Sequence, residues 1–117
     1  MRRGKDRFQI LQSEFKNLDL LRIALIHRSF LNEAPEALDS NERLEFLGDA
    51  VLNLIVSEEL FRLFPDLPEG KLTKLRTSLI CRPCLAQAAK RLKLGEHLVL
   101  GRGEEKSGGR EKQGNLS

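Results

Sequence analysis

The sequence predicts an all-α fold, and two observations support that prediction. Apolar residues recur at helical spacing in several segments, and proline, glycine or short polar residues separate these segments. Residues 41–61 form a longer stretch without proline that suits one long helix. The chain has 117 residues, of which 40% are hydrophobic and 32% charged, so it is globular and sized for a single domain.

Two short helices are expected ahead of the long one. Residues 6–15 form the first, with Phe8 on its inner side. Residues 17–19 cap the second, which is expected to end near residues 27–30. Residues 31–41 contain a proline and several short polar side chains, so they are expected to form a connecting loop.

Prolines and glycines mark the helices that follow. Pro65 ends the long helix, and residues 69–79 carry leucines on one face of the next helix. Pro83 suits the first turn of a further helix over residues 84–94, which Gly95 is expected to stop. These signals complete a chain of helices without a predicted sheet.

The expected domain is a helical body over residues 6–100, followed by a glycine-rich basic segment over residues 101–117 that is loop-like in every residue. No stretch of about 18 apolar residues is present to span a membrane, and the N-terminus lacks the apolar core of a signal peptide. Two cysteines are too few for a disulfide framework. A cytoplasmic protein is therefore expected.

The long helix carries an unusual surface. Glu42, Glu45 and Asp49 stand at positions i, i+3 and i+7, so they project from one side. Apolar residues also flank this acidic side, in addition to a main apolar stripe made of Leu44, Leu47, Val51, Leu54 and Ile55. Carboxylates among hydrophobic side chains are costly unless a positive charge lies with them. Spacing alone leaves a bound cation and a solvated acidic face equally open.

Charge is distributed unevenly along the chain, although the net charge is only +3. Residues 31–60 contain eight acids and a single base, Arg43, whereas residues 71–94 contain seven bases and no acid. This order suits a site that holds metal ions beside a polyanion. It suits equally two packed helices that neutralise each other.

The cysteines and histidines give weaker indications. Cys81 and Cys84 form a CRPC pair, but zinc needs two further ligands and a redox motif is expected between strands and helices. We therefore assign both cysteines a structural role. His27 and His97 are the only histidines, and no serine or cysteine is tied to them in a nucleophilic triad. His27 is likewise interpreted as structural.

Four ordered motifs resemble those of one family. NERLEFLGDAVL at residues 41–52 closely resembles the signature of the ribonuclease III family, which cleaves double-stranded RNA. HRSFLNE at 27–33 is similar to the segment ahead of that signature, and PEGKLTKLR at 68–76 is similar to the segment after it. LGRGEEKSGGR at 100–110 is similar to the loop before the family's last catalytic helix. The resemblance covers the chain from about residue 8 onward.

The resemblance implies an all-helical homodimer in which the helices over residues 41–61 of two subunits pack together. It implies an endonuclease that hydrolyses RNA phosphodiesters with a metal-activated water, leaving 5′-phosphate and 3′-hydroxyl ends, in ribosomal or other RNA processing. Glu45 and Asp49 correspond to ligands of Mg²⁺, for which Mn²⁺ can substitute. Glu42 and Glu69 correspond to further catalytic acids.

Two groups of basic residues are candidates for contact with the RNA backbone. The first follows the signature and the second lies in the glycine-rich segment; they are Lys71, Lys74 and Arg76, and Arg102, Lys106 and Arg110. A-form RNA is recognised chiefly through its shape and its phosphates, which suits mobile basic side chains. For each single residue, a solubilising surface charge is an equally good interpretation.

The sequence departs from the family at its C-terminal end. The family completes its metal site with an Asp and a Glu on a helix after the glycine-rich loop, and a double-stranded-RNA-binding domain follows. Neither is found in residues 1–117. The chain is therefore expected to be a partial catalytic domain, missing the C-terminal helix or helices, that cleaves little RNA alone. The alternatives are a non-catalytic helical dimer that binds double-stranded RNA and a dimerisation domain.

Overall fold

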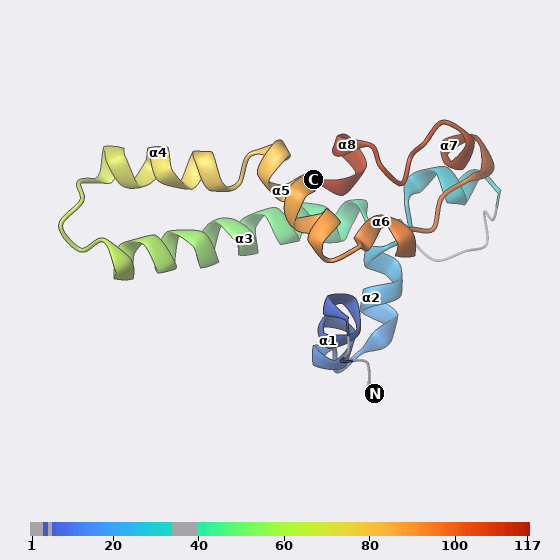
Figure 1. Ribbon diagram of the computed structural model, residues 1–117, viewed down its shortest axis with the longest axis horizontal. Coiled ribbons are helices and arrows are strands. Elements are labelled where there is room, and N and C mark those ends of the chain that lie inside the picture. Colours follow the sequence, from blue (N-terminus) through green and yellow to red (C-terminus); the bar gives the residue numbers. More distant parts are fainter. Residues whose placement is uncertain (1–3, 5, 34–39) are drawn as a thin grey trace.

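A computed structural model describes residue 4, residues 6–33 and residues 40–117 of the chain. Figure 1 shows its helices, α1 to α8 with one 3₁₀ helix, η1. Within the described residues the one extended pairing is an isolated parallel bridge between Ile26 and Val99. The predicted all-α class is confirmed. The elements are α1 (Arg7–Glu14), α2 (Leu18–Ala24), η1 (Arg28–Asn32), α3 (Glu42–Leu63), α4 (Glu69–Leu79), α5 (Arg82–Arg91), α6 (Leu94–His97), α7 (Arg102–Lys106) and α8 (Gln113–Leu116).

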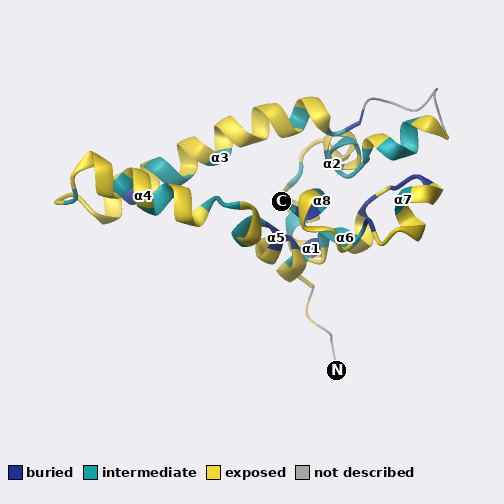
Figure 2. Ribbon diagram, turned by 90° about the horizontal axis from the view of Figure 1, so that it is seen from above, coloured by how far each residue is buried: buried dark blue, intermediate teal, exposed yellow. Residues whose placement is uncertain are grey.

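Helices α3 and α4 lie side by side and antiparallel, and together they form an arm on the left of Figure 1. Helix α3 has 22 residues and is the longest element. Its C-terminal half contacts α4, where Arg76 donates a hydrogen bond of 2.8 Å to the Ser57 hydroxyl. Leu60 is the buried residue of α3, with 6% of its surface exposed. Most of the arm is exposed, as the yellow ribbon in Figure 2 shows.

The two N-terminal helices begin with side-chain caps. Asp6 and Gln9 form a reciprocal capping box at α1, and the Asn17 side chain accepts a hydrogen bond from the Asp19 N–H at α2. Phe8, as predicted, is buried; its ring stacks on that of His97, with 3.5 Å between the centroids. This contact joins the N-terminal helix to α6.

The main buried cluster lies between α5, α8 and the segment that joins α6 to α7. Its members come from three parts of the chain that are distant in sequence: Ala86, Ala89, Leu98, Leu100 and Leu116. The small alanines let α5 approach α8 closely, and Leu25 and Leu94 pack against the edge of the cluster. No helix in the described part of the chain is long and apolar enough to cross a membrane.

The end of α5 differs from the prediction. The helix ends at Arg91 rather than at residue 94, and Lys93 adopts the left-handed conformation, with φ of 56°. Gly95 does not stop a helix but lies inside the short helix α6. A Cβ atom at position 95 would come within 2.4 Å of the Arg110 carbonyl oxygen. The glycine is therefore needed for close approach of two backbone segments.

Residues 101–117 are not loop-like throughout, contrary to the prediction. They contain α7 and α8, joined by a turn in which Gly108 has a φ of +80°. Both helices are very short, so hydrogen bonds to distant residues stabilise them rather than helical propensity. These bonds also shape the candidate site.

Candidate functional site

The acidic face of α3 lies in the N-terminal part of the helix. Glu42, Glu45 and Asp49 are all exposed. Among the described residues none of these carboxylates takes part in an ion pair or accepts a side-chain hydrogen bond. Glu42 and Glu45 lie in the first turn, where the partial positive charge of the helix N-terminus favours anions. The oxygen atoms of all three carboxylates are thus available to a cation or to water.

Glu42 and Glu45 border a pocket of about 360 Å³. Its walls come from three elements: the start of α3, the residues at the beginning of η1, and α8 with the C-terminal residue. Asp49 lies one turn farther along α3 and is outside this lining. The remaining lining residues are His27, Arg28, Asn41, Gly114, Asn115, Leu116 and Ser117.

Glu69 is placed at the other end of the arm. It is the first residue of α4 and borders a separate pocket of about 230 Å³ with Leu60 and Phe61 of α3. The 15 positions from Glu45 to Leu60 correspond to about 22 Å along a helix. A single chain therefore brings Glu42 and Glu45 together, but it does not bring Glu69 to them. The catalytic roles of these residues stay predictions.

The metal-binding capacity of this face is limited. Among the described residues no group of three or more His, Cys, Asp or Glu side chains is arranged to share a metal ion. Glu45 and Asp49 stand one helical turn apart and offer hard oxygen donors, and Mg²⁺ accepts one or two carboxylates while keeping several waters. The two residues therefore fit a weakly held, largely hydrated ion.

The six predicted RNA-contacting residues differ in how far they are exposed. Lys71 and Lys74 on α4, and Arg102 and Lys106 on α7, are exposed, and their side chains make no hydrogen bond or ion pair among the described residues. Arg76 is half-buried because its guanidinium group bonds Ser57 on α3. Four of the residues can thus contact a polyanion, whereas Arg76 also links α4 to α3.

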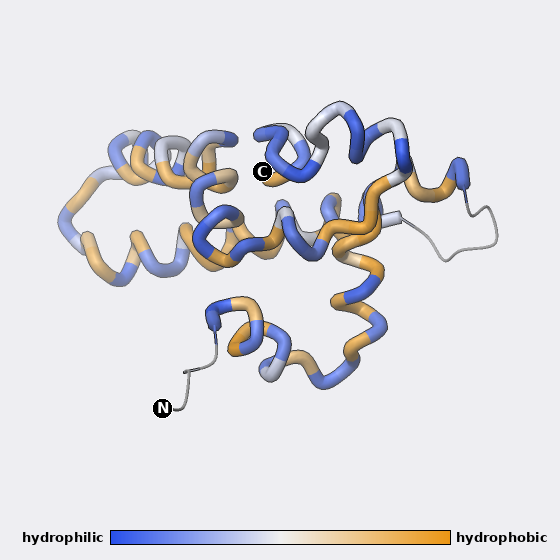
Figure 3. The backbone as a smooth tube through the Cα atoms, turned by 45° about the vertical axis from the view of Figure 1, so that its right-hand side comes forward, coloured by the Kyte–Doolittle hydropathy of each residue, from blue (hydrophilic) through white to orange (hydrophobic). Residues whose placement is uncertain are grey.

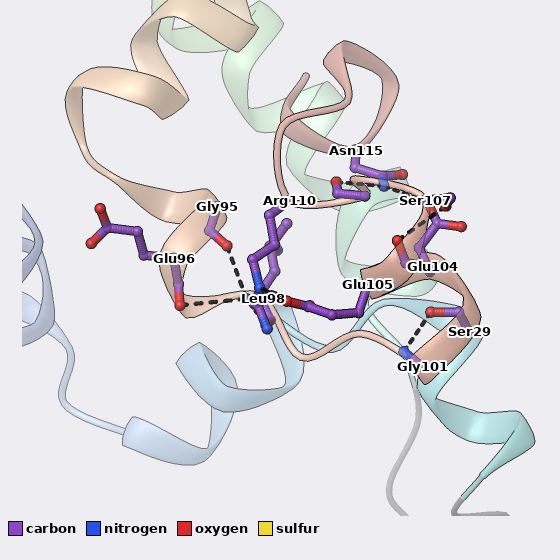
Figure 4. Close-up of polar contacts among 11 residues, drawn as sticks. Ser29, Gly95, Glu96, Leu98, Gly101, Glu104, Glu105, Ser107, Arg110 and Asn115 are labelled. Atoms are coloured by element: carbon purple, nitrogen blue, oxygen red, sulfur yellow. Dashed lines mark hydrogen bonds and ion pairs between the residues drawn. The ribbon is translucent and has the colours of Figure 1, made fainter.

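Arg110 does not lie in a flexible loop, contrary to the prediction. Figure 4 shows its side chain turned toward the segment between Gly95 and Leu98. Its Nη1 donates to the carbonyl oxygens of Leu98 at 2.6 Å, Gly95 at 3.0 Å and Glu96 at 3.4 Å. Its Nε also pairs with Glu105 at 2.7 Å. With its Nε and Nη1 used in this way, Arg110 stabilises the fold, and a contact between this residue and RNA stays a prediction.

Glu104 is a central residue that sequence reasoning missed. Its Oε1 accepts hydrogen bonds of 3.0 Å from both the Lys112 ammonium and the Asn115 amide, and the Asn115 amide also donates to the Gly109 carbonyl. The bond from Lys112, followed by that from Asn115, lowers the pKa of Glu104. These bonds tie α7 to α8, which forms a wall of the Glu42–Glu45 pocket. Nothing in the sequence separates Glu104 from the neighbouring Glu105.

A second set of bonds supports the opposite wall. The Ser29 hydroxyl lies 2.8 Å from His27 Nδ1 and accepts a 2.8 Å hydrogen bond from the Gly101 N–H. The Ser29 N–H also donates to His27 Nδ1, so that nitrogen is an acceptor and the ring proton of a neutral His27 lies on Nε2. His27 thus anchors η1 to the chain ahead of α7, in line with the structural role predicted for it.

Comparison with known proteins shows which family shares this sequence. The Ribonuclease-III-like family model matches residues 17–116. Ribonuclease 3 of Staphylococcus epidermidis RP62A is 52% identical over 106 residues, which cover 90% of this chain and 43% of that protein. Ribonuclease 3 of Oleidesulfovibrio alaskensis is 49% identical over 108 residues, covering 92% and 47%. The chain thus spans less than half the length of these curated relatives.

Solved structures agree with the sequence matches. A structure of the nuclease domain of ribonuclease III from Campylobacter jejuni superposes with a TM-score of 0.84 at 42% identity, covering 97% of this chain and 77% of that one. Its description concerns structural flexibility in a region involved in dimer formation. A second structure of the same Campylobacter domain gives a TM-score of 0.82. The fold is that of a ribonuclease III nuclease domain, and the chain belongs to the Ribonuclease-III-like family.

Proposed function

We propose that this chain provides the metal-dependent endonuclease activity of a ribonuclease III that cleaves double-stranded RNA, in ribosomal or other RNA processing in the cytoplasm. Membership of the family carries the proposal, because the relatives named Ribonuclease 3 align over nearly the whole chain. The expected reaction is hydrolysis of a phosphodiester bond that leaves 5′-phosphate and 3′-hydroxyl ends. The exposed acids at the start of α3 are the residues of this chain that suit such chemistry.

Glu45 and Asp49 would hold Mg²⁺, or Mn²⁺ in its place, on the exposed side of α3. The ion would supply an activated water and neutralise the charge that develops on the phosphate. Glu42 lies in the same helical turn as Glu45 and can accept hydrogen bonds from water bound between them. Because no three His, Cys, Asp or Glu side chains in the described part of the chain are arranged to share an ion, we expect weak metal binding and slow cleavage by the 117-residue chain.

Four exposed cations would contact the RNA. Lys71 and Lys74 lie on α4, and Arg102 and Lys106 lie on α7. Contacts to phosphates contribute affinity without reading sequence, so binding by these residues should weaken steeply as salt rises. The same contacts would serve an alternative function, which is binding of double-stranded RNA without cleavage.

A cleavage assay separates these functions. End-labelled double-stranded RNA is incubated with the chain in Mg²⁺, and binding is measured separately in Ca²⁺. We expect slow Mg²⁺-dependent cutting that Glu45→Gln and Asp49→Asn each abolish, while the matched control Glu58→Gln, an exposed acid on the same helix, leaves it unchanged. RNA binding in Ca²⁺ with no cutting in Mg²⁺ at any metal concentration would favour the binding function instead.

The second part of the proposal is a homodimer through α3. Exposed apolar side chains run along this helix, including Phe46 at 81%, Leu54 at 67% and Ile55 at 58% exposure. Figure 3 shows hydrophobic positions along the arm, away from the main buried cluster. Contiguous exposed apolar surface of this kind marks an interaction site. The partner we propose is a second copy of the chain, because the Campylobacter domain is described as having a dimer-forming region.

The surface area of the chain supports this pairing. The accessible surface is 9436 Å², whereas a folded monomer of 13.3 kDa is expected to expose about 6,500 Å². The radius of gyration is 16.6 Å, against about 13 Å for a compact chain of this length. The excess of accessible surface over that of a folded monomer is larger than the roughly 1,600 Å² that a stable interface buries in total. One chain alone therefore leaves more surface uncovered than a stable dimer requires.

Sedimentation equilibrium tests the dimer. We expect the wild-type chain to sediment as a dimer and Leu54→Asp to sediment as a monomer, because a carboxylate at the interface would be buried without a partner. Asn53→Asp is the matched control, since it adds the same charge at an exposed neighbouring position. A monomeric wild-type chain at micromolar concentration would contradict the pairing.

A further inference from the structure

The corner between α4 and α5 holds two cysteines that the proposed nuclease function does not use. Cys81 is the N-cap residue of α5, Pro83 lies in the first turn of that helix, and Cys84 follows one residue later. Their two sulfur atoms lie 3.0 Å apart and share a hydrogen bond. Both thiols are free and half-buried, so a small molecule can reach them. This geometry differs from that of a single structural cysteine in an apolar core.

Both thiols also converge on one acceptor. The Ser78 carbonyl oxygen, in the last turn of α4, receives a hydrogen bond of 3.4 Å from Cys81 and one of 3.1 Å from Cys84. The last carbonyls of a helix have no partner within the helix, so the two S–H groups cap α4. The reduced pair therefore has a structural function, and this function depends on its protons.

We propose that Cys81 and Cys84 form a redox-active dithiol, which a small anionic disulfide compound oxidises reversibly to an intramolecular disulfide. Cys81 is the attacking thiol and Cys84 is the resolving thiol. The closeness of the sulfurs carries the inference, since the second sulfur already lies beside the first and needs no rearrangement of the chain to reach it. The modification lies outside the acidic face of α3 and does not rest on the proposed nuclease activity.

The two cysteines differ in their readiness to ionise. Hydrogen bonding between the Cys81 sulfur and the Cys84 thiol, followed by that with the Cys84 backbone, lowers the pKa of Cys81. The same sulfur–sulfur hydrogen bond, followed by burial, raises the pKa of Cys84. Because Cys81 occupies the N-cap position of α5, the partial positive charge of the helix N-terminus also favours its thiolate. Cys81 is thus the better nucleophile at neutral pH.

The reaction proceeds by two thiol–disulfide exchanges. The Cys81 thiolate attacks one sulfur of the disulfide compound, the bond between its two sulfurs breaks, and the first thiolate leaves and takes up a proton. Cys84 then loses its proton and attacks the Cys81 sulfur, which forms the Cys81–Cys84 bond and expels the second thiolate. The protein loses two electrons and two protons, and the disulfide compound gains them as two thiols. An excess of the small thiol reverses both steps.

Charge near the corner favours an anionic oxidant. Residues 71–94, which include α4 beyond its first two residues, the corner and α5, contain seven bases and no acid. Arg82 stands between the two cysteines in sequence and is exposed. A negatively charged disulfide such as oxidised glutathione would be concentrated beside Cys81, more so at low salt.

Trapping of thiols tests the proposal. The reduced 117-residue chain is equilibrated in glutathione buffers of rising oxidised fraction, quenched with an alkylating reagent and weighed by intact-protein mass spectrometry. We expect both cysteines to lose their reactivity toward the alkylating reagent together. The oxidised chain should weigh two hydrogen atoms less than the reduced, unalkylated chain and should carry no lasting glutathione adduct. Cys84→Ser should trap a stable adduct on Cys81, and Cys81→Ser should form an adduct at least about tenfold more slowly.

Two further measurements keep the outcomes distinct. Hydrogen exchange of the amides in the last turn of α4 should accelerate in the oxidised chain, because the Ser78 carbonyl loses both S–H donors. Addition of excess reduced glutathione should restore both alkylation sites. A chain that still carries two alkylated cysteines in the most oxidised buffer would overturn the proposal, as would a lasting adduct on wild-type Cys81 without ring closure.

Discussion

Arg110 provides a direct test of how the C-terminal segment is stabilised. Its side chain bonds two partly buried carbonyl oxygens, those of Leu98 and Gly95, and pairs with Glu105 at the surface. Each hydrogen bond contributes about 1 kcal/mol net, and more where the donor is charged, whereas an exposed ion pair contributes at most about 1 kcal/mol. Arg110→Met keeps the aliphatic part of the side chain and removes these bonds, so we expect a loss of about 2–3 kcal/mol.

Thermal unfolding measures this loss. For a chain of this length 1 kcal/mol corresponds to a Tm shift of roughly 3–5 °C, so Arg110→Met should lower Tm by about 10 °C. Arg102→Met is the matched control, because Arg102 is exposed and its side chain makes no hydrogen bond among the described residues. We expect the control to keep its Tm and to weaken RNA binding. Arg110→Met with an unchanged Tm and weakened RNA binding would refute the structural role and restore the original RNA-contact prediction. Both proteins are compared at one concentration, since association shifts Tm.

Two other predictions concern the walls of the pocket. Because the folded-state pKa of Glu104 is lowered, its ionised form contributes stability above the pKa of the unfolded chain, and this contribution is lost as pH falls through the folded-state pKa. Tm of the wild type should therefore fall more than Tm of Glu104→Gln does as pH is lowered below 4.5, the ordinary pKa of the carboxyl group; equal slopes would contradict the role of its bonds to Lys112 and Asn115. Gly101→Ala should destabilise the chain by about 1–3 kcal/mol, since the new Cβ would lie 2.4 Å from the Ser29 carbonyl oxygen. Gly103→Ala, which meets nothing within 4 Å, should be neutral by chemical denaturation, and equal effects of the two substitutions would argue against the close contact.

The sequence was sufficient for elements whose causes are local. Helix α4 begins and ends as predicted, at Glu69 and Leu79, because Pro68 precedes it and its leucines share one face. The acidic face of α3 also followed from spacing alone. Helices α7 and α8 could not be predicted, since contacts such as Arg110 with Leu98 and Glu104 with Asn115 join residues 12 and 11 positions apart in arrangements that no local pattern specifies. The separation of Glu69 from Glu45 likewise depends on how the arm packs.

The candidate site and the proposed dimer surface occupy the same helix. Helix α3 presents Glu45 and Asp49 beside Phe46 and Leu54, and these apolar side chains remain exposed in the single chain. The main buried cluster contains small and medium side chains from α5, α8 and the segment after α6, and among the described residues no large side chain is fully buried. Such a cluster gives modest stability, so covering α3 would add substantially to it. Pairing through α3 would thus stabilise the fold and, in the same step, fix the helix that carries the acids proposed to bind metal. A substitution that prevents pairing, such as Leu54→Asp, is therefore expected to lower both Tm and metal affinity, although it touches neither carboxylate.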